Sequence, residues 1–255
     1  MSKAIGALVL LVPLAAWSQA VDEKGAEEAL AKFREGYKGA ASDRASAVAT
    51  LAQTQHDKTL SKLGNILMGD PEASVRCAAA KGIGTWKESK NKAAATLVNG
   101  LAANVRVTEV QVEIFKALGD LEDPVAAPTA HFTFKDKDVK VAKAAIECTG
   151  EIRSRDSIKP LVDYLENMER KRDSGGGGAG VGGFGGLPGG AGGGDDPQTR
   201  RAKELIPALN KALQSITLER YSNPKDWEVW WKRNEATFKV PPKPEPAADK
   251  KKKKK

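Results

Sequence analysis

A repeated segment of about 32 residues constrains this sequence more than any other feature. Four stretches align on their last residues at steps of 32, 35 and 31 residues: RASAVATLA (44–52), VRCAAAKGIG (75–84), VQVEIFKALG (110–119) and VKVAKAAIECTG (139–150). Periods of this size are typical of helical repeat arrays, in which each unit buries its apolar face against its neighbours. The repetition therefore predicts an all-α chain of stacked units.

Each period is expected to hold two helices. The four aligned stretches form the second helices, and first helices are expected over 57–68, 91–102, 124–134 and 157–168. Leu60, Leu63 and Leu67 recur at three- and four-residue steps, which places them on one face of a helix. Pro128 and Pro160 lie 32 residues apart, a few residues inside a first helix, where proline is tolerated in the first turn.

Helix ends carry their own signals. Helix starts are predicted at four pairs of an N-cap residue and a proline: Asp70-Pro71, Asp123-Pro124, Asp196-Pro197 and Asn223-Pro224. Gly84, Gly119 and Gly150 are expected to close the second helices. A glycine there can adopt the left-handed conformation of a C-cap, and it also lets a neighbouring backbone approach closely.

The composition shifts along the chain predict three regions. Residues 1–20 have the cation, apolar run and small residues of a signal peptide cleaved near Ala20, with a retained membrane anchor as the alternative. Residues 21–238 form the helical repeat domain, interrupted over 175–194 by a tract in which fourteen of twenty residues are glycine, expected to be disordered. Residues 239–255 form a disordered tail rich in proline and lysine.

The net charge of +8 is concentrated at the two ends. Lys3 and the terminal run of Lys250, Lys251, Lys252, Lys253, Lys254 and Lys255 account for all but about one unit of it. The body is therefore nearly neutral, which argues against specific nucleic-acid recognition. The lysine run, helped by 170–172, could bind an anionic lipid, wall polymer or nucleic acid, or it could simply keep the chain soluble.

The segments DPEASVRCAAAKGIG and DSIKPLVDYL resemble HEAT repeats, including the PBS-lyase HEAT-like repeats. The stretch ITLERYSNPKDWEVWWKRN is similar to the closing helix of secreted bacterial HEAT-repeat proteins. The resemblance covers about 26–234 and implies an α-α superhelix that binds proteins, with second helices on the concave side. It also implies that Asp70 and Arg76 belong to a structural ladder. Ala52 and Lys140 depart from the repeat pattern.

Three tryptophans, Trp227, Trp230 and Trp231, are spaced to share one helical face. We expect them to cover the apolar end of the last repeat, with an aromatic binding platform as the alternative. Cys77 and Cys148 lie two repeats apart, too far for a disulfide bond, and are expected to be buried thiols.

Catalytic signals are weak in this chain. His56 and His131 belong to different repeats without metal-ligand spacing, and are expected on the surface or in loops. The glycines of 178–183 match G-x-G-x-x-G but lack the strand and helix that a dinucleotide site requires. The sequence therefore predicts a non-enzymatic, exported scaffold without cofactor or metal that binds a protein partner. The alternative is an envelope tether that binds polyanions through Lys250–Lys255.

Overall fold

The computed structural model describes residues 22–175 and 196–244. Within these ranges the chain is all-helical, with eleven α-helices, two short 3₁₀ turns and no strand. The helices are α1 (Glu23–Gly36), α2 (Ala41–Leu51), α3 (Asp57–Gly69), α4 (Ala73–Ile83), α5 (Lys90–Ala103), α6 (Thr108–Leu121), α7 (Ala127–Thr133), α8 (Val139–Ile152), α9 (Ile158–Gly175), α10 (Pro197–Thr217) and α11 (Pro224–Asn234); the 3₁₀ turns are η1 (Pro124–Ala126) and η2 (Arg155–Ser157).

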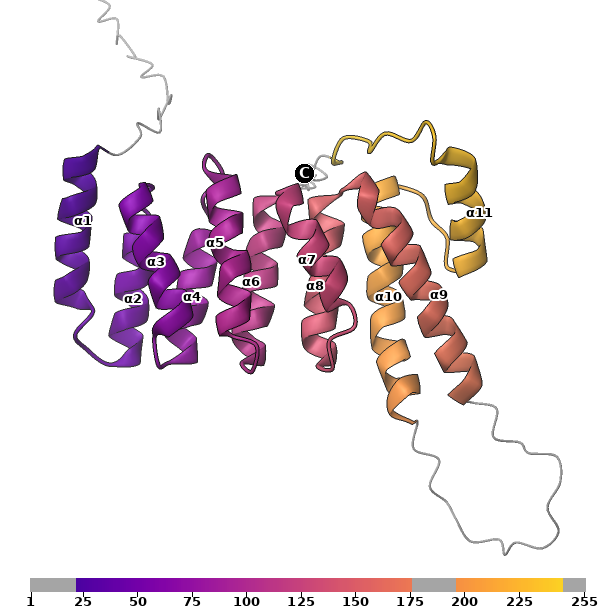
Figure 1. Cartoon of the computed structure of the whole chain (residues 1–255), viewed down its shortest axis with the longest axis horizontal. Coiled ribbons are helices and arrows are strands. Elements are labelled where there is room, and N and C mark those ends of the chain that lie inside the picture. The colour runs from indigo at the N-terminus through magenta and orange to yellow at the C-terminus, as the bar shows by residue number, and fades with distance from the viewer. Residues whose placement is uncertain (1–21, 176–195, 245–255) are drawn as a thin grey trace, which may run out of the picture.

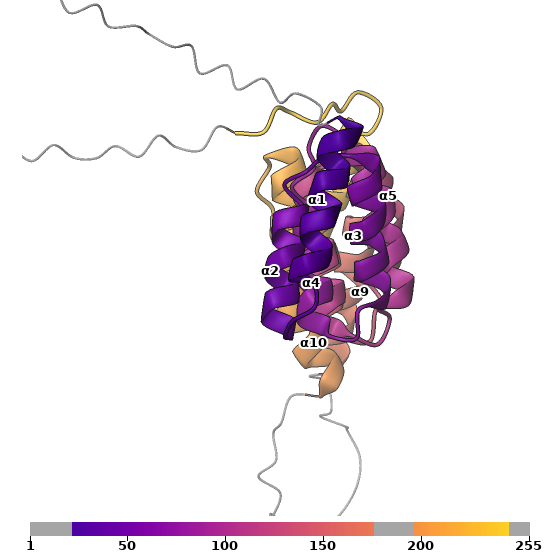
Figure 2. The ribbon, with the colours of Figure 1, turned by 90° about the vertical axis from the view of Figure 1, so that its left-hand side faces the viewer.

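The helices stand side by side in chain order along the long axis of the molecule (Figure 1). Helices α2, α4, α6, α8 and α10 pack one against the next, while α3 packs on α5 beside them. Seen from the N-terminal end, α2 and α4 lie on one side and α3 and α5 on the other (Figure 2). The core is a continuous apolar seam between these two layers, running from Phe33 to Trp231.

The predicted pairing of helices is confirmed. The four aligned stretches lie in α2, α4, α6 and α8, and the predicted first helices coincide with α3, α5, α7 and α9. Leu60, Leu63 and Leu67 are buried on the inner face of α3, as their spacing predicted. Helix α7 is only seven residues long and follows the turn η1. Pro128 and Pro160 lie in the first turns of α7 and α9.

Three of the four predicted helix starts are confirmed, and the fourth is wrong. The side chains of Asp123, Asp196 and Asn223 each accept a hydrogen bond from a backbone N–H of the turn or helix that follows. Asp70 instead ends α3, and α4 begins three residues later at Ala73. Its carboxylate still accepts from the N–H of Glu72, but its main partners are Tyr37, just after α1, and Arg44 of α2.

The prediction that three glycines end the second helices is confirmed for Gly84 alone, and none of the three adopts the left-handed conformation. Gly84 ends α4 with an ordinary right-handed φ of −60°, and Gly119 and Gly150 lie inside α6 and α8. The left-handed positions that follow these two helices belong to Glu122 and Arg153. The close approach of a neighbouring backbone, also predicted for these glycines, is confirmed: all three lie where helices of one layer pack closely. A Cβ on Gly150 would lie 2.9 Å from Cα of Ala212, and one on Gly84 equally close to Cα of Ala117.

A buried ion pair joins the first repeats, although not the one expected. Arg44 of α2 donates two hydrogen bonds of 3.1 and 3.2 Å to the carboxylate of Asp70, which also accepts from the hydroxyl of Tyr37. Burial alone raises the pKa of Asp70, but these bonds and that from Glu72 outweigh it and hold the pKa below its usual value. Arg76 does not take part in this ion pair, and its Nε is buried without a hydrogen-bond partner among the described residues.

Replacing Arg44 with glutamine is expected to lower the free energy of unfolding, because the nearly buried carboxylate of Asp70 loses its charged partner. The side chain of Asp70 is 2% exposed and cannot recover that interaction from water. Urea unfolding of the variant and of Arg34→Gln, an exposed arginine of α1, provides the measurement and its control. Equal midpoints for the two variants would contradict this role of the ion pair.

The two cysteines are free, and no disulfide joins them. Cys148 is buried in α8, and burial raises the pKa of its thiol, which therefore stays protonated. Cys77 is only half-buried, so the prediction of two buried thiols is confirmed for Cys148 alone. None of the described helices is both long enough and apolar enough to cross a membrane.

The last helix and the residues after it cover the C-terminal end of the row. Trp227 and Trp231 of α11 are buried, and Trp230 lies partly buried beside them at 6.1 and 6.2 Å between ring centroids. Phe238 stacks edge-on against Trp230, and Val240 packs on the core. These contacts support the covering role that we expected for the tryptophans.

The first residues of the predicted tail contact the row of helices. The chain after α11 runs back along the row toward α8 (Figure 1). There Lys243 pairs with Glu122, just after α6, at 2.7 Å and with Glu151 of α8 at 3.1 Å. Residues 239–244, which the sequence assigned to the tail, therefore lie against the helical row. Lys250–Lys255 lie outside the described residues.

Candidate binding groove between α7, α9 and α10

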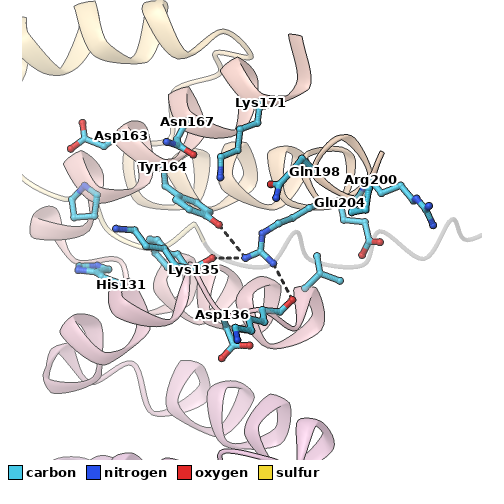
Figure 3. A pocket seen from close by; sticks show the side chains of 16 residues that line it. His131, Lys135, Asp136, Asp163, Tyr164, Asn167, Lys171, Gln198, Arg200 and Glu204 are labelled. Atoms are coloured by element: carbon cyan, nitrogen blue, oxygen red, sulfur yellow. Dashed lines mark hydrogen bonds between the residues drawn. The ribbon is translucent and has the colours of Figure 1, made fainter. Parts of the chain in front are cut away.

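A groove of about 1090 Å³ runs beside α9 at the C-terminal part of the row (Figure 3). Helix α9 forms one wall through Pro160, Tyr164, Asn167 and Lys171, which recur at three- and four-residue steps. The first turns of α10 form the opposite wall, and the end of α7 with the loop to α8 forms the floor. Because three elements converge here, the groove exists only in the folded chain.

Arg201 of α10 fixes the geometry of the floor. Its guanidinium donates to the backbone carbonyl oxygens of Phe134 at 3.0 Å and Lys137 at 3.4 Å, and lies 3.2 Å from the hydroxyl oxygen of Tyr164. The dashed lines in Figure 3 mark these three bonds. One side chain thus ties the α7–α8 loop and α9 to α10, so the walls are held in place before any ligand binds.

Aromatic rings lie beneath the polar rim. Phe134 is buried, and its ring centroid lies 5.7 Å from that of Tyr164 and 5.6 Å from that of His131. His131 was expected on the surface or in a loop, but it is a half-buried residue of α7 whose Nε2 lies 2.9 Å from the hydroxyl oxygen of Ser157. The floor therefore combines apolar rings with one fixed imidazole.

His131 is expected to make the protein less stable as the pH falls below neutrality. Burial lowers the pKa of His131 from its ordinary value of 6.5, and the nearby charge of Asp156 only partly opposes this. The unfolded chain therefore takes up a proton at a higher pH than the folded chain, so stability is lost as the pH falls through about 6.5. Urea midpoints at about pH 7.5 and about pH 5.5 measure the modest loss. The His131→Gln variant should show a smaller difference between the two midpoints than the unmodified protein. An equal difference in the two proteins would show that His131 does not cause the loss of stability.

The charged residues around the groove are mostly basic. Five cations line it, and three carboxylates accompany them; they are Lys135, Lys137, Lys171, Arg200 and Arg201, with Asp136, Asp163 and Glu204. Asp163 is already paired with Lys159 at 2.9 Å, and Asp136 accepts a hydrogen bond from the backbone N–H of Asp138. Lys135 and Lys137 form no ion pair or hydrogen bond through their side chains with other described residues. The groove therefore attracts negative charge.

A second groove, of about 910 Å³, lies on the other side of α9, against α10 and α11. It is lined by as many basic residues, but four of them pair with its own carboxylates. These pairs are Lys159–Asp163, Arg170–Glu166, Arg172–Glu169 and Lys232–Glu228. Its charges are thus satisfied internally, which distinguishes it from the first groove.

The sequence reasoning did not find this groove. Of the residues singled out beforehand, those that line this groove are Pro160, His131, Lys171 and Pro197. Trp231 lines the second groove instead, and His56 caps α3 by accepting from the N–H of Lys58. The match to G-x-G-x-x-G at 178–183 lies outside the described residues, and within those residues no group of acidic, histidine or cysteine side chains could hold a metal ion.

One sequence signal could have indicated the site. Lys135 and Lys137 flank Asp136 in the connection between two helices, and a charged connection of this kind often carries function. The opposite wall comes from residues more than sixty positions later, so only the fold could join the two. Comparison of the chain with models of known families and with curated proteins finds no match.

Proposed function

We propose that this protein is an exported scaffold, built as a HEAT-like solenoid, that binds a protein partner along the groove between α7, α9 and α10. The observation that carries the proposal is the groove itself, with walls that Arg201 ties together before binding. The two-layered order of helices and the repeat of about 32 residues support the solenoid. Extended arrays of this type commonly serve as binding surfaces, and the signal-like residues 1–20 support export.

Site-specific crosslinking tests this proposal in the full chain. A photo-crosslinking amino acid replaces Asn167, which lines the groove, or Asn99, an exposed residue of α5 that serves as the control. Crosslinks are formed in the envelope of the native host and identified by mass spectrometry. A partner captured from position 167 and not from 99 is the expected result. The same set of proteins at both positions, or none at 167, would contradict a partner site in the groove.

The lysine run supports a second proposal, that of an envelope tether. Six consecutive lysines at 250–255 would bind an anionic lipid or polymer with a strong dependence on salt. Deletion of 250–255 separates the two proposals. Loss of envelope retention with unchanged crosslinking at position 167 would support a tether acting beside the scaffold. Unchanged retention after the deletion would contradict the tether.

A further inference from the structure

We infer that the ligand of the groove is an acidic, extended peptide segment of about five residues; this inference rests on the proposed function and specifies its partner. The groove follows α9 from Pro160 to Lys171, a distance of roughly 16 Å along the helix. An extended chain advances about 3.3 Å per residue, so roughly five residues span it. A folded domain would contact the rim alone, whereas an extended segment reaches the floor.

The charges of the groove specify an acidic segment. Lys135 and Lys137 reach the groove from the loop after α7 without a carboxylate partner among the described residues, whereas the nearby Asp163 is paired with Lys159. A peptide carboxylate would complete this arrangement. The second groove, against α11, has a similar size but pairs most of its lysines and arginines internally, and it offers no comparable attraction.

The polar groups of the two walls suit a peptide backbone. Asn167 on α9 and Gln198 on α10 face the groove from opposite sides (Figure 3). Each carries an amide that both donates and accepts, which matches the alternating N–H and C=O groups of an extended chain. The ring of Phe134 in the floor and the ring of Tyr164 on the α9 wall offer an apolar surface for one side chain of the peptide.

The same features disfavour a nucleic acid. A nucleic-acid strand carries a negative charge at every step, and here three carboxylates, those of Asp136, Asp163 and Glu204, line the groove among the cations. A peptide can place its acidic residues near the lysines and a neutral residue near Glu204. The mixed lining therefore fits a ligand whose charge varies along its length.

Fluorescence anisotropy with the full chain tests the inference. The probe is a fluorescein-labelled peptide of sequence Asp-Glu-Phe-Glu-Asp, blocked at both ends, and its neutral counterpart is Asn-Gln-Phe-Gln-Asn. We expect the acidic peptide to bind and the double variant K135E/K137E to weaken binding about tenfold. Lys225→Glu is the control: it makes a single reversal of an exposed charge in the second groove and should change affinity less than about twofold. Lys250–Lys255 can also attract the acidic peptide, so the comparison that reports on the groove is the one between K135E/K137E and K225E, which both retain these lysines.

Several results would overturn the inference. One is that the acidic and neutral peptides bind with equal affinity, and another is that K135E/K137E and K225E weaken binding equally. A third is that a single-stranded oligonucleotide binds more tightly than the acidic peptide and that K135E/K137E abolishes its binding. A photo-reactive version of the peptide that attaches to 250–255 rather than to α9 or α10 would overturn the inference as well. If these tests fail while position 167 still captures a partner in the envelope, the proposed scaffold stands and only the acidic-peptide ligand is rejected.

Discussion

Replacing Trp227 with alanine is expected to release α11 from the end of the helical row, at a cost of about 4 kcal/mol to its local stability. The indole is fully buried, and its N–H donates to Oδ1 of Asn210 on α10 at 3.0 Å. Edge-on contacts with Tyr221 and Trp230 would be lost together with the apolar burial.

Amide hydrogen exchange is the measurement that resolves this effect. In a stacked array each unit is stabilised by its neighbours, so the loss should be confined to one end. The amides of α11 should exchange much faster in Trp227→Ala, while those of α4 and α6 keep their protection. Val229→Ala serves as the control because Val229 is 46% exposed on the same helix. Uniform loss of protection along the whole chain would show that α11 is part of a single cooperative core instead.

Replacing Gly150 with valine is expected to lower the free energy of unfolding by about 3 kcal/mol. A Cβ at this position would lie 2.9 Å from Cα and 3.1 Å from Cβ of Ala212, closer than side-chain carbon atoms pack. Helices α8 and α10 would have to separate, and the hydroxyl of Ser215, which donates to the carbonyl oxygen of Gly150, would lose its partner. This contact packs α10 against α8, so the position of the groove wall that α10 forms depends on it.

Chemical denaturation followed by circular dichroism measures this change. The matched control is Gly69→Ala at the end of α3, where an added Cβ would meet no atom within 4 Å. That control should be neutral or slightly stabilising, because alanine favours helix more than glycine does. A Gly150→Val variant as stable as the control would mean that α8 and α10 can separate at little cost.

The repeat could be predicted from the sequence because it depends on local periodicity. Leu60, Leu63 and Leu67 had to lie on one face of a helix, and the helix pairs followed from the fixed spacing of the aligned stretches. Side chains that cap their own helix, such as Asp123 and Asn223, were also predictable, since both partners lie within a few residues. The burial of Trp227 followed from the need to cover the last unit.

Contacts between units were not predictable in this way. Asp70 has the local sequence of an N-cap, yet Arg44 and Tyr37, which lie far earlier in the chain, determine its role. The local pattern at Gly119 and Gly150 suggested left-handed C-caps, but both lie inside their helices, and only the close approach of a neighbouring helix that the pattern also suggested is found there. Lys243 belonged to a tail by composition, but two carboxylates at the ends of α6 and α8 hold it.

By itself the sequence determined that this chain folds into helices paired at a period of about 32 residues, because apolar spacing and N-caps act over a single turn or two of the backbone. Only the tertiary structure decided where a ligand can bind. Lys135, Tyr164 and Arg201 are separated by dozens of residues, and they line one groove because α7, α9 and α10 pack together. Burial and charge pairing at that groove are properties of the packed helices and are absent from any one segment.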